Sequence, residues 1–282
     1  MKSSVSRVVA AVSVVVALGA SAACSSGDGG GDADKGTKPP ASAGPSKLEK
    51  AALAAGDVKG YKVEKPDESE SGSGSGAEPG SSVGAPPAGK PSPAECAPLA
   101  AMLDVRTEGK AQGAEGKATG AEGKAAGAEG KATGHVSRIL TPTDGKDFTT
   151  TRVGLSSHAA SDAERTMADL RAAARSKKCS AFRIGEQRYI GVRSLPAPHK
   201  GDEAVSYKIA HRRGEFVMRD SVTVVRTGAT LAVFDASNLY DPEGVQRDRD
   251  AEKDGTGGIG TPTADEDPKV APVIVDAQLG KV

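Results

Sequence analysis

The sequence predicts an α+β domain in which helices pack on an antiparallel sheet. Segments with helical periodicity near residues 92–104 and 161–177 come before most of a series of short, strand-like runs joined by turn residues. Helices followed by sequential hairpins are typical of an antiparallel sheet with helices on one face. Polar, Gly-rich stretches interrupt the pattern and predict a flexible N-terminal tether and low-complexity insertions.

The first 24 residues have the order of a bacterial lipoprotein signal. A positively charged start and an apolar run over residues 8–20 lead to three small residues directly before Cys24. This arrangement resembles a lipobox, in which the cysteine becomes the lipidated first residue of the mature chain. It departs from the usual pattern at Ser21, where a lipobox has Leu.

A lipid on Cys24 would anchor the protein to the outer face of the cell membrane. The apolar run has about 13 residues, fewer than the ~20 that span a bilayer as a helix. We therefore expect residues 1–23 to be a removed signal peptide, Cys24 to carry acyl chains such as palmitate, and residues 24–45 to be a disordered tether. The alternative is ordinary secretion, with Cys24 left as a thiol.

The cysteine count favours one disulfide. The chain has three cysteines, so lipidation of Cys24 leaves Cys96 and Cys179 as an even pair in an oxidising compartment. A bond between them closes a loop of about 84 residues, for which the chain-entropy model gives roughly 4.5 kcal/mol. Two buried thiols are the alternative, and a catalytic thiol is disfavoured because neither cysteine has a histidine nearby in the sequence.

The N-terminal part of the domain contains two helix signals. Residues 46–55 predict a helix with Ser46 as its N-cap, followed by a turn and a short strand from Tyr61. After a linker over residues 66–91, Ser92-Pro93-Ala94-Glu95 forms a capping box. Behind it, apolar residues fall at i, i+3, i+4 and i+7 on one helix face: Cys96, Leu99, Ala100 and Leu103.

Residues 109–134 contain a seven-residue repeat of the form GKAxGAE. No position carries Leu, Ile or Val, and the two glycines in each unit cost about 1 kcal/mol apiece in a helix. We therefore expect a flexible surface insertion rather than a coiled coil. A lysine array for anionic wall polymers is less favoured, because a glutamate matches each lysine.

The region from His135 to Tyr240 carries most of the predicted sheet. Strands are expected over 136–140 and 148–156, and a second capping box at 161–164 begins a helix that ends near Lys177. This helix should bury Ala163, Met167, Leu170 and Ala174. Five further strands are expected at Ser180–Ile184, Arg188–Val192, Val205–His211, Phe216–Arg226 and Thr230–Ala236.

The C-terminal part is expected to contain an acidic, Gly-rich loop and a closing helix. The loop covers residues 241–264, and the helix lies within 267–279, where Pro272 leaves its start open. Residues 255–260 match G-x-G-x-x-G, but no strand precedes them and no helix follows, so a linker is favoured. Residues 250–255 imitate the start of an EF-hand loop, yet the twelfth position is Thr261 and cannot supply a bidentate carboxylate.

No other pattern carries recognisable chemistry. The four histidines, His135, His158, His199 and His211, have no metal-ligand spacing. Asp202-Glu203 is expected to be a turn before a strand rather than a general acid/base pair. His211-Arg212-Arg213 is expected to be a solvated hairpin tip rather than an anion-recognition spot. A hydrolase function is a further hypothesis, but no motif supports it. We therefore expect no enzyme activity, metal or cofactor.

Five segments in order resemble one known family. They are KLEKAALAAGDVKGY from Lys47, ECAPLAAML around Cys96, SHAASDAERTMADLRAAARSKKCSAF around Cys179, GDEAVSYK from Gly201 and VTVVRTGATLAVF from Val222. Together with the closing helix they cover about residues 46–282, interrupted by the linker and the repeat, and they resemble the PknH-like extracellular sensor domain of actinobacterial receptor kinases and lipoproteins.

This resemblance implies an antiparallel sheet packed with helices around a cleft, and a role in sensing or binding. The chain departs from the family's kinase ectodomain in allowing one disulfide rather than two, and any signalling would need another protein. We expect a membrane-anchored extracytoplasmic lipoprotein that binds an unknown extracellular ligand or envelope component. The alternative is a structural or protein-interaction module of the envelope. The net charge of zero gives no basic footprint for nucleic acid.

Overall fold

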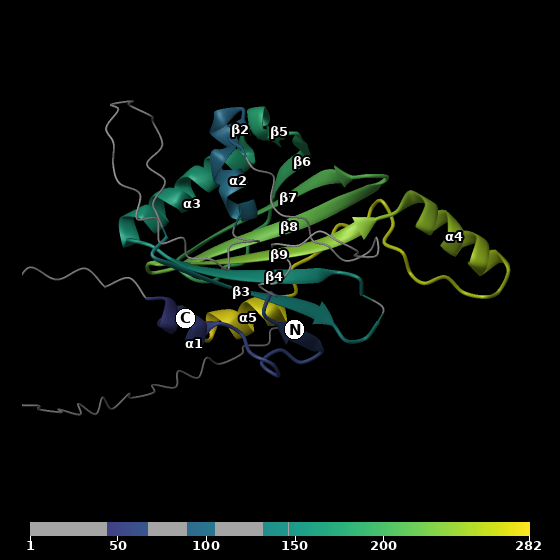
Figure 1. The fold of residues 1–282 in the computed structure, drawn as a ribbon, viewed down its shortest axis with the longest axis horizontal. Coiled ribbons are helices and arrows are strands. Elements are labelled where there is room, and N and C mark those ends of the chain that lie inside the picture. Colours follow the sequence, from purple (N-terminus) through teal and green to yellow (C-terminus); the bar gives the residue numbers. More distant parts are fainter. Residues whose placement is uncertain (1–43, 67–88, 105–131, 146) are drawn as a thin grey trace, which may run out of the picture. The chain divides into compact units, whose positions relative to one another are not determined.

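The computed structural model describes residues 44–66, 89–104, 132–145 and 147–282 (Figure 1). These residues fall in one compact unit. Several expected features lie wholly or mostly outside the described residues: the signal peptide (1–23), Cys24, the tether (24–45), the linker (66–91) and the repeat (109–134).

A nine-stranded antiparallel sheet in the order β1-β3-β4-β9-β8-β7-β6-β5-β2 confirms the α+β class (Figure 1). All of the strands expected from the sequence are present within it. The strands are β1 (Tyr61–Glu64), β2 (Pro91–Ser92), β3 (Gly134–Pro142), β4 (Thr150–Ser157), β5 (Ala181–Ile184), β6 (Gln187–Leu195), β7 (Glu203–Arg213), β8 (Phe216–Thr227) and β9 (Thr230–Tyr240).

Helices cover both faces of this sheet, so the expectation of helices on one face is wrong. The helices are α1 (Pro45–Ala51), η2 (Ala94–Cys96), α2 (Ala97–Asp104), α3 (Ala160–Arg175), η3 (Lys177–Cys179), α4 (Pro242–Lys253) and α5 (Pro272–Leu279). The cause is visible in the central strands, which are apolar on both sides. In β9, Val233 packs in the core under α3, whereas Ala232 and Phe234 pack in the core that contains Ile274 of α5.

The first core lies between the sheet and helices α2 and α3. The predicted helix faces are confirmed, because Cys96, Leu99, Ala100 and Leu103 are buried in α2 and the turn before it, and Ala163, Met167, Leu170 and Ala174 are buried in α3. These side chains contact the inward residues of β7 and β8, including Tyr207 and Val222.

The second core lies on the opposite face, under α1 and α5. Leu48 and Leu53 pack there with Phe234 and Ile274. The side chain of Gln278 in α5 donates a 2.7 Å hydrogen bond to the Ala51 carbonyl, so the two helices are joined directly. An ion pair between Lys281 and Asp57 adds a second connection.

All three predicted N-caps are wrong. Helix α1 follows Gly44, with Pro45 at its first position, so Ser46 lies inside it. Ser92 belongs to β2, where it pairs with Arg183, and a 3-10 turn intervenes before α2. Helix α3 begins after Ala159, because the His158 amide is already fixed by a 2.9 Å bond to the Ala229 carbonyl.

A helix stands where an acidic loop was expected. Helix α4 begins at Pro242, and the Asp241 side chain caps it by accepting from the Glu243 amide at 3.0 Å. The Asp-Pro pair is thus a helix start that the low-complexity composition concealed. At the C-terminus, Pro272 occupies the first turn of α5, which resolves where the expected closing helix begins.

Candidate ligand pocket

A pocket of about 470 Å³ opens on the face of the sheet that carries α5. This volume lies within the ~300–1,000 Å³ typical of small-molecule sites. Its walls come from the β6–β7 connection and from the segment that leads into α5, and its floor comes from β7 and β8. The apolar lining residues are Leu195, Pro196, Ala197, Pro198, Pro268, Val270, Pro272 and Val275.

The floor carries three hydroxyl groups. Ser206 of β7 pairs directly with Thr223 of β8, and Ser221 lies two residues along β8 on the same side of the strand. The Ser206 and Thr223 hydroxyls are 2.8 Å apart and hydrogen-bond to each other. The Ser221 side chain makes no hydrogen bond within the described part of the chain, although Ser221 is only 5 % exposed.

Prolines make the walls apolar and stiff. Pro196 and Pro198 belong to the β6–β7 connection, and Pro268 and Pro272 flank the opposite wall. Proline has no backbone N–H and a fixed φ angle, so these positions offer a ligand little hydrogen bonding and change shape little. The hydrogen-bonding groups of the pocket are therefore concentrated at its floor and mouth.

The mouth of the pocket carries two lysines and one aspartate. Lys200 and Asp276 form a 2.8 Å ion pair that connects the β6–β7 wall to α5. Lys269 is exposed and makes no ion pair with any described residue. The local balance of two positive charges and one negative charge leaves an excess of one positive charge at the mouth.

Buried Arg219 holds the segment that leads into the α5 wall. Its Nη1 donates to the carbonyls of Thr263 (2.7 Å) and Ala264 (3.1 Å), and its Nε donates to Asn238 Oδ1 (3.0 Å). Its guanidinium carbon lies 5.3 Å from the ring centroid of Tyr240. Burial lowers the pKa of Arg219, and nearby Asp267 opposes this shift, but an arginine side chain stays charged in proteins.

A second contact fixes the same segment. Lys208 of β7 pairs with Asp267, the residue directly before Pro268 of the pocket wall. Lys208 faces the same side of the sheet as Ser206, because the two positions differ by two residues in β7. The wall is thus attached to the sheet at residues 263–267, immediately beside the pocket.

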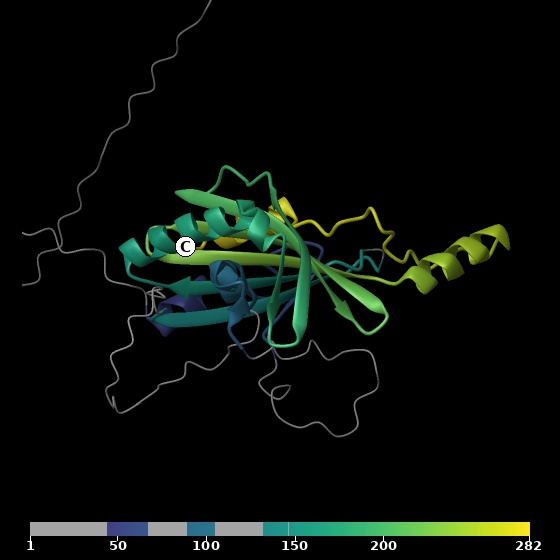
Figure 2. The same cartoon turned by 90° about the horizontal axis from the view of Figure 1, so that it is seen from above.

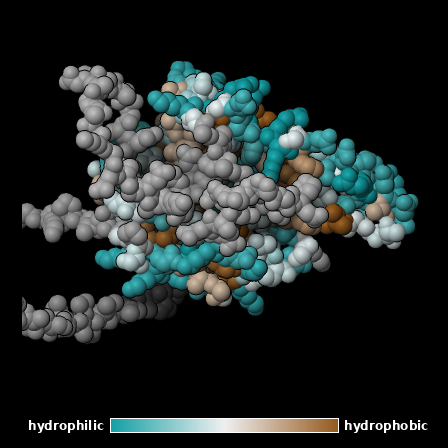
Figure 3. All heavy atoms as spheres, in the orientation of Figure 1, coloured by the Kyte–Doolittle hydropathy of each residue, from teal (hydrophilic) through white to brown (hydrophobic). Residues whose placement is uncertain are grey.

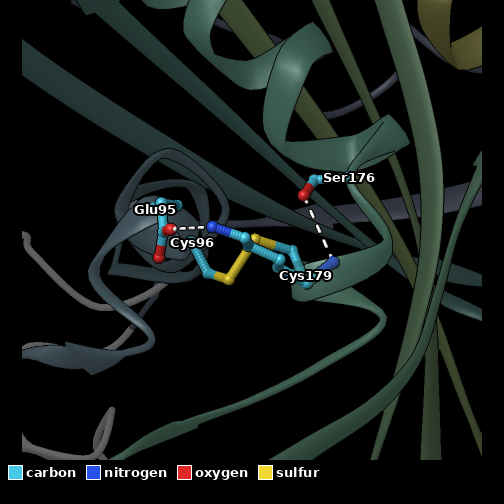
Figure 4. The surroundings of a disulfide bond; sticks show 5 residues. Glu95, Cys96, Ser176 and Cys179 are labelled. Carbon is cyan, nitrogen blue, oxygen red and sulfur yellow. Dashed lines mark hydrogen bonds and ion pairs between the residues drawn. A yellow bond between two sulfur atoms is a disulfide. The ribbon is translucent and has the colours of Figure 1, made fainter.

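The predicted Cys96–Cys179 disulfide is present and buried on the other face of the sheet (Figure 4). Its Cα atoms are 5.6 Å apart, and it joins η2, before α2, to η3, after α3. An exposed ion pair between Glu95 and Lys178 (2.9 Å) lies beside it. Both sulfurs are committed to the bond, so neither cysteine is a thiol in this structure.

The EF-hand-like segment and the G-x-G-x-x-G match do not form a binding site. Asp250 and Glu252 lie within α4, which is incompatible with an EF-hand loop, and residues 255–260 run from the end of α4 with no strand before them. Among the described residues, no group of three His, Cys, Asp or Glu side chains could hold a metal ion.

The acid pair and the basic tip also have structural partners. Asp202 accepts from Arg226 (3.1 Å) and from the Gly228 amide (2.7 Å), and Glu203 pairs with Arg171 of α3. Residues 202–203 thus connect the turn after β8 with α3, in agreement with the structural prediction. Arg212 and Arg213 are exposed at the β7–β8 hairpin, whereas the His211 ring packs 5.2 Å from Tyr189.

One polar row was missed by the sequence reasoning. Arg152, Asp235, Asp220 and His211 lie on adjacent strands β4, β9, β8 and β7, on the face toward α3. Asp220 is 1 % exposed and Asp235 is 4 % exposed. A charged residue within an otherwise apolar strand run, as at Asp235 in LAVFDAS, is the signal that could have indicated this row.

Comparison with family models and with curated proteins gives this chain no relative. No family model matches it, and no curated protein matches it significantly. Among the described residues, no helix is both long enough and apolar enough to cross a membrane.

Proposed function

We propose that this chain is a membrane-anchored extracytoplasmic lipoprotein with a PknH-like sensor domain, and that its pocket binds an extracellular ligand or envelope component. The observation that carries the binding role is the pocket itself, with apolar walls, a hydroxyl floor and a charged mouth. Concave, mostly apolar sites with a few placed polar groups are typical of small-molecule binding.

The lining chemistry favours binding over catalysis. The polar groups of the pocket are three hydroxyls, two lysines and an aspartate that is already paired with Lys200. Such groups orient a ligand through hydrogen bonds and charge. A nucleophile next to a general base, the usual requirement for covalent catalysis, is not found among these lining residues.

The fold supports binding because it holds the pocket in a fixed form. Arg219 and Lys208 attach the 263–267 segment to the sheet, and the proline walls have restricted backbones. A preorganised site loses less conformational freedom when a ligand enters. The order of segments that resembles the sensor family adds support for a sensing role of such a site.

Ligand binding can be tested with a lipid-free chain that carries Cys24→Ser. A thermal-shift screen against sugars, wall fragments and amphiphiles should raise the unfolding midpoint with at least one compound class, since a ligand that binds the native state stabilises it. In the variant Ala197→Trp, the larger side chain should fill the pocket and remove this shift. Without ligand, its unfolding midpoint should equal that of the parent chain. A flat screen, or a shift that survives in Ala197→Trp, would contradict the proposed pocket.

Anchoring at Cys24 has a separate test. In cells fed a clickable palmitate analogue, the wild-type chain should be labelled and should sediment with membranes. Cys24→Ser should lose both properties because the acceptor sulfur is gone. A variant that still carries label would exclude Cys24 as the lipidated residue, and an unlabelled wild type would favour ordinary secretion.

A second candidate function, a protein-interaction module, is favoured by the position of α4. This helix extends away from the end of β9 in two views (Figures 1 and 2), and only Gly244 and Val245 of it are buried. Its surface is predominantly hydrophilic (Figure 3). A photo-crosslinker at Glu252, compared with one at exposed Lys59, should recover a reproducible membrane partner if this candidate is correct.

A further inference from the structure

The groups that line the pocket are arranged by depth. Ser206, Ser221 and Thr223 on the floor are between 5 and 8 % exposed, whereas the side chains of Lys200 and Asp276 at the mouth are about half exposed. Aliphatic and proline side chains occupy the walls between these levels. A matching ligand therefore has a polar inner end, an apolar middle and a charged outer end.

We propose that the pocket takes an amphipathic monoanion of the hydroxy-acid type. Its apolar body lies between the proline walls, its acidic headgroup pairs with Lys269 at the mouth, and a hydroxyl at its far end meets Ser221. This inference rests on the proposed function, because it names the ligand class of the same pocket.

The inner end is assigned from Ser221. Ser206 and Thr223 satisfy each other, but the Ser221 hydroxyl faces the pocket without a hydrogen-bond partner among the described residues. A purely apolar chain end would bury this hydroxyl unsatisfied, which is unfavourable. A ligand hydroxyl can both donate to it and accept from it, so a hydroxylated end is preferred.

The outer end is assigned from the charge at the mouth. Lys200 is neutralised by Asp276 at 2.8 Å, so it offers little net charge to a ligand. Lys269 has no such partner among the described residues and follows Pro268 of the wall directly. The positive charge that Lys269 offers at the opening complements one anionic headgroup.

The body of the ligand is assigned from the walls. The prolines offer no N–H group, and Leu195, Val270 and Val275 are aliphatic. A sugar or peptide would leave several polar groups without partners against these walls. An alkyl chain would instead bury apolar surface.

The probes are 12-hydroxydodecanoate, dodecanoate and the methyl ester of 12-hydroxydodecanoate, titrated calorimetrically against the Cys24→Ser chain. The hydroxy acid should bind most tightly. Dodecanoate should bind about fivefold more weakly because it lacks the inner hydroxyl. The ester should bind about threefold more weakly because it lacks the charge, a modest factor since Lys269 is exposed.

Two variants assign these losses to residues. Ser221→Ala should remove the difference between the hydroxy acid and dodecanoate. Lys269→Gln should remove the difference between the acid and its ester, whereas the matched control Lys59→Gln, an exposed lysine outside the pocket, should leave that difference unchanged. A retained preference in either pocket variant would overturn the corresponding contact.

The outcomes separate this inference from the proposed function. If all three probes fail to bind while another compound class shifts the wild type but not Ala197→Trp, the ligand class is wrong and the binding function stands. If no compound binds in the pocket, both are wrong. Equal affinity for all three probes would overturn the hydroxy-acid assignment alone.

Discussion

Arg219 has an unusual position for a charged residue, since it is 7 % exposed on the sheet face beside the pocket. Burying a guanidinium is costly unless its N–H groups find acceptors. Asn238 and two backbone carbonyls of the 263–267 segment supply them for Nε and Nη1, whereas Nη2 has no acceptor among the described residues. The cost of burial is thus offset only while that segment stays in place, which makes Arg219 a positioning residue for the pocket wall.

Replacing Arg219 should therefore destabilise the protein and weaken ligand binding. We expect Arg219→Met to lower the free energy of unfolding by roughly 2–3 kcal/mol, because hydrogen bonds to charged groups are lost and the 263 and 264 carbonyls lose their donor. Urea denaturation measures this change. Arg249→Met on the exposed surface of α4 should change stability by less than about 0.5 kcal/mol.

Asp248 illustrates a carboxylate that organises backbone. It accepts from the amides of Ile259 (2.9 Å) and Thr261 (2.6 Å), and so fastens the return segment to α4. These hydrogen bonds, with that of Thr261 first, lower the pKa of Asp248. Gly258 is required beside it, since an added Cβ would lie 2.7 Å from the Asp248 side chain.

A lowered pKa in the folded state gives a definite pH dependence. The stabilisation from Asp248 should be complete above its unfolded pKa, near 3.9, and should be lost as the pH falls through the lower folded value. Amide exchange at residues 259 and 261, followed by NMR, should stay slow at pH 5 and accelerate only well below pH 4. Asp248→Asn should accelerate it at every pH, whereas Asp254→Asn, with the same charge change, should not.

At the scale of elements, the sheet and most helices could be predicted because their signals are local. The alternation of Thr151, Val153 and Leu155 marks β4, and all three residues are buried. The helix faces of α2 and α3 follow from apolar residues spaced three and four positions apart. Helix starts were missed because distant contacts decide them: Ser92 pairs with Arg183, which is 91 positions away in the chain.

The pocket could not be predicted for a related reason. Its floor and walls come from β7, β8, the β6–β7 connection and the approach to α5, and only the folded sheet brings them together. Ser206 and Ser221 are ordinary strand residues in the sequence. Helix α4 was missed because its charged composition suggests a loop, although Asp241-Pro242 is a recognisable helix start.

The disulfide connects two helical elements, η2 and η3, and the effect of its loss on stability can be measured. The double variant Cys96→Ala/Cys179→Ala should lower the free energy of unfolding by about 2–5 kcal/mol, since the unfolded chain loses a long-loop constraint. Urea denaturation with and without reductant checks this value. Reductant should destabilise the wild type by a similar amount and leave the double variant unaffected. Intact mass after reduction should show two added hydrogen atoms, one on each thiol, only in the wild type.

At the scale of the whole molecule, two cores lie on opposite faces of one sheet. The disulfide strengthens the core under α2 and α3, whereas Gln278 and Lys281 join α5 to the N-terminal region on the other side. The segments of each face are far apart in the sequence: Gln278 bonds to Ala51 across 227 positions. Local patterns indicated the two helices α1 and α5, but this long-range closure is why their position on the opposite face of the sheet could not be inferred from those patterns.

The position of the two cores on opposite faces leads to a prediction. Gln278→Ala should cost about 1–3 kcal/mol, because the partly buried Ala51 carbonyl loses its donor. Hydrogen exchange should increase in α1 and α5 and remain unchanged in α2 and α3. Gln246→Ala on exposed α4 serves as the control, and increased exchange on both faces would contradict the independence of the two cores.

The bond between α5 and α1 links the pocket to the helix that follows the proposed anchor. Helix α5 contributes Pro272, Val275 and Asp276 to the pocket, and α1 is the first described helix after the segment that leads from Cys24. The pocket wall formed by α5 and the helix nearest in sequence to Cys24 therefore share one core and one direct hydrogen bond. In the proposed lipoprotein, a displacement of this wall would act first on the helix closest to the proposed anchor.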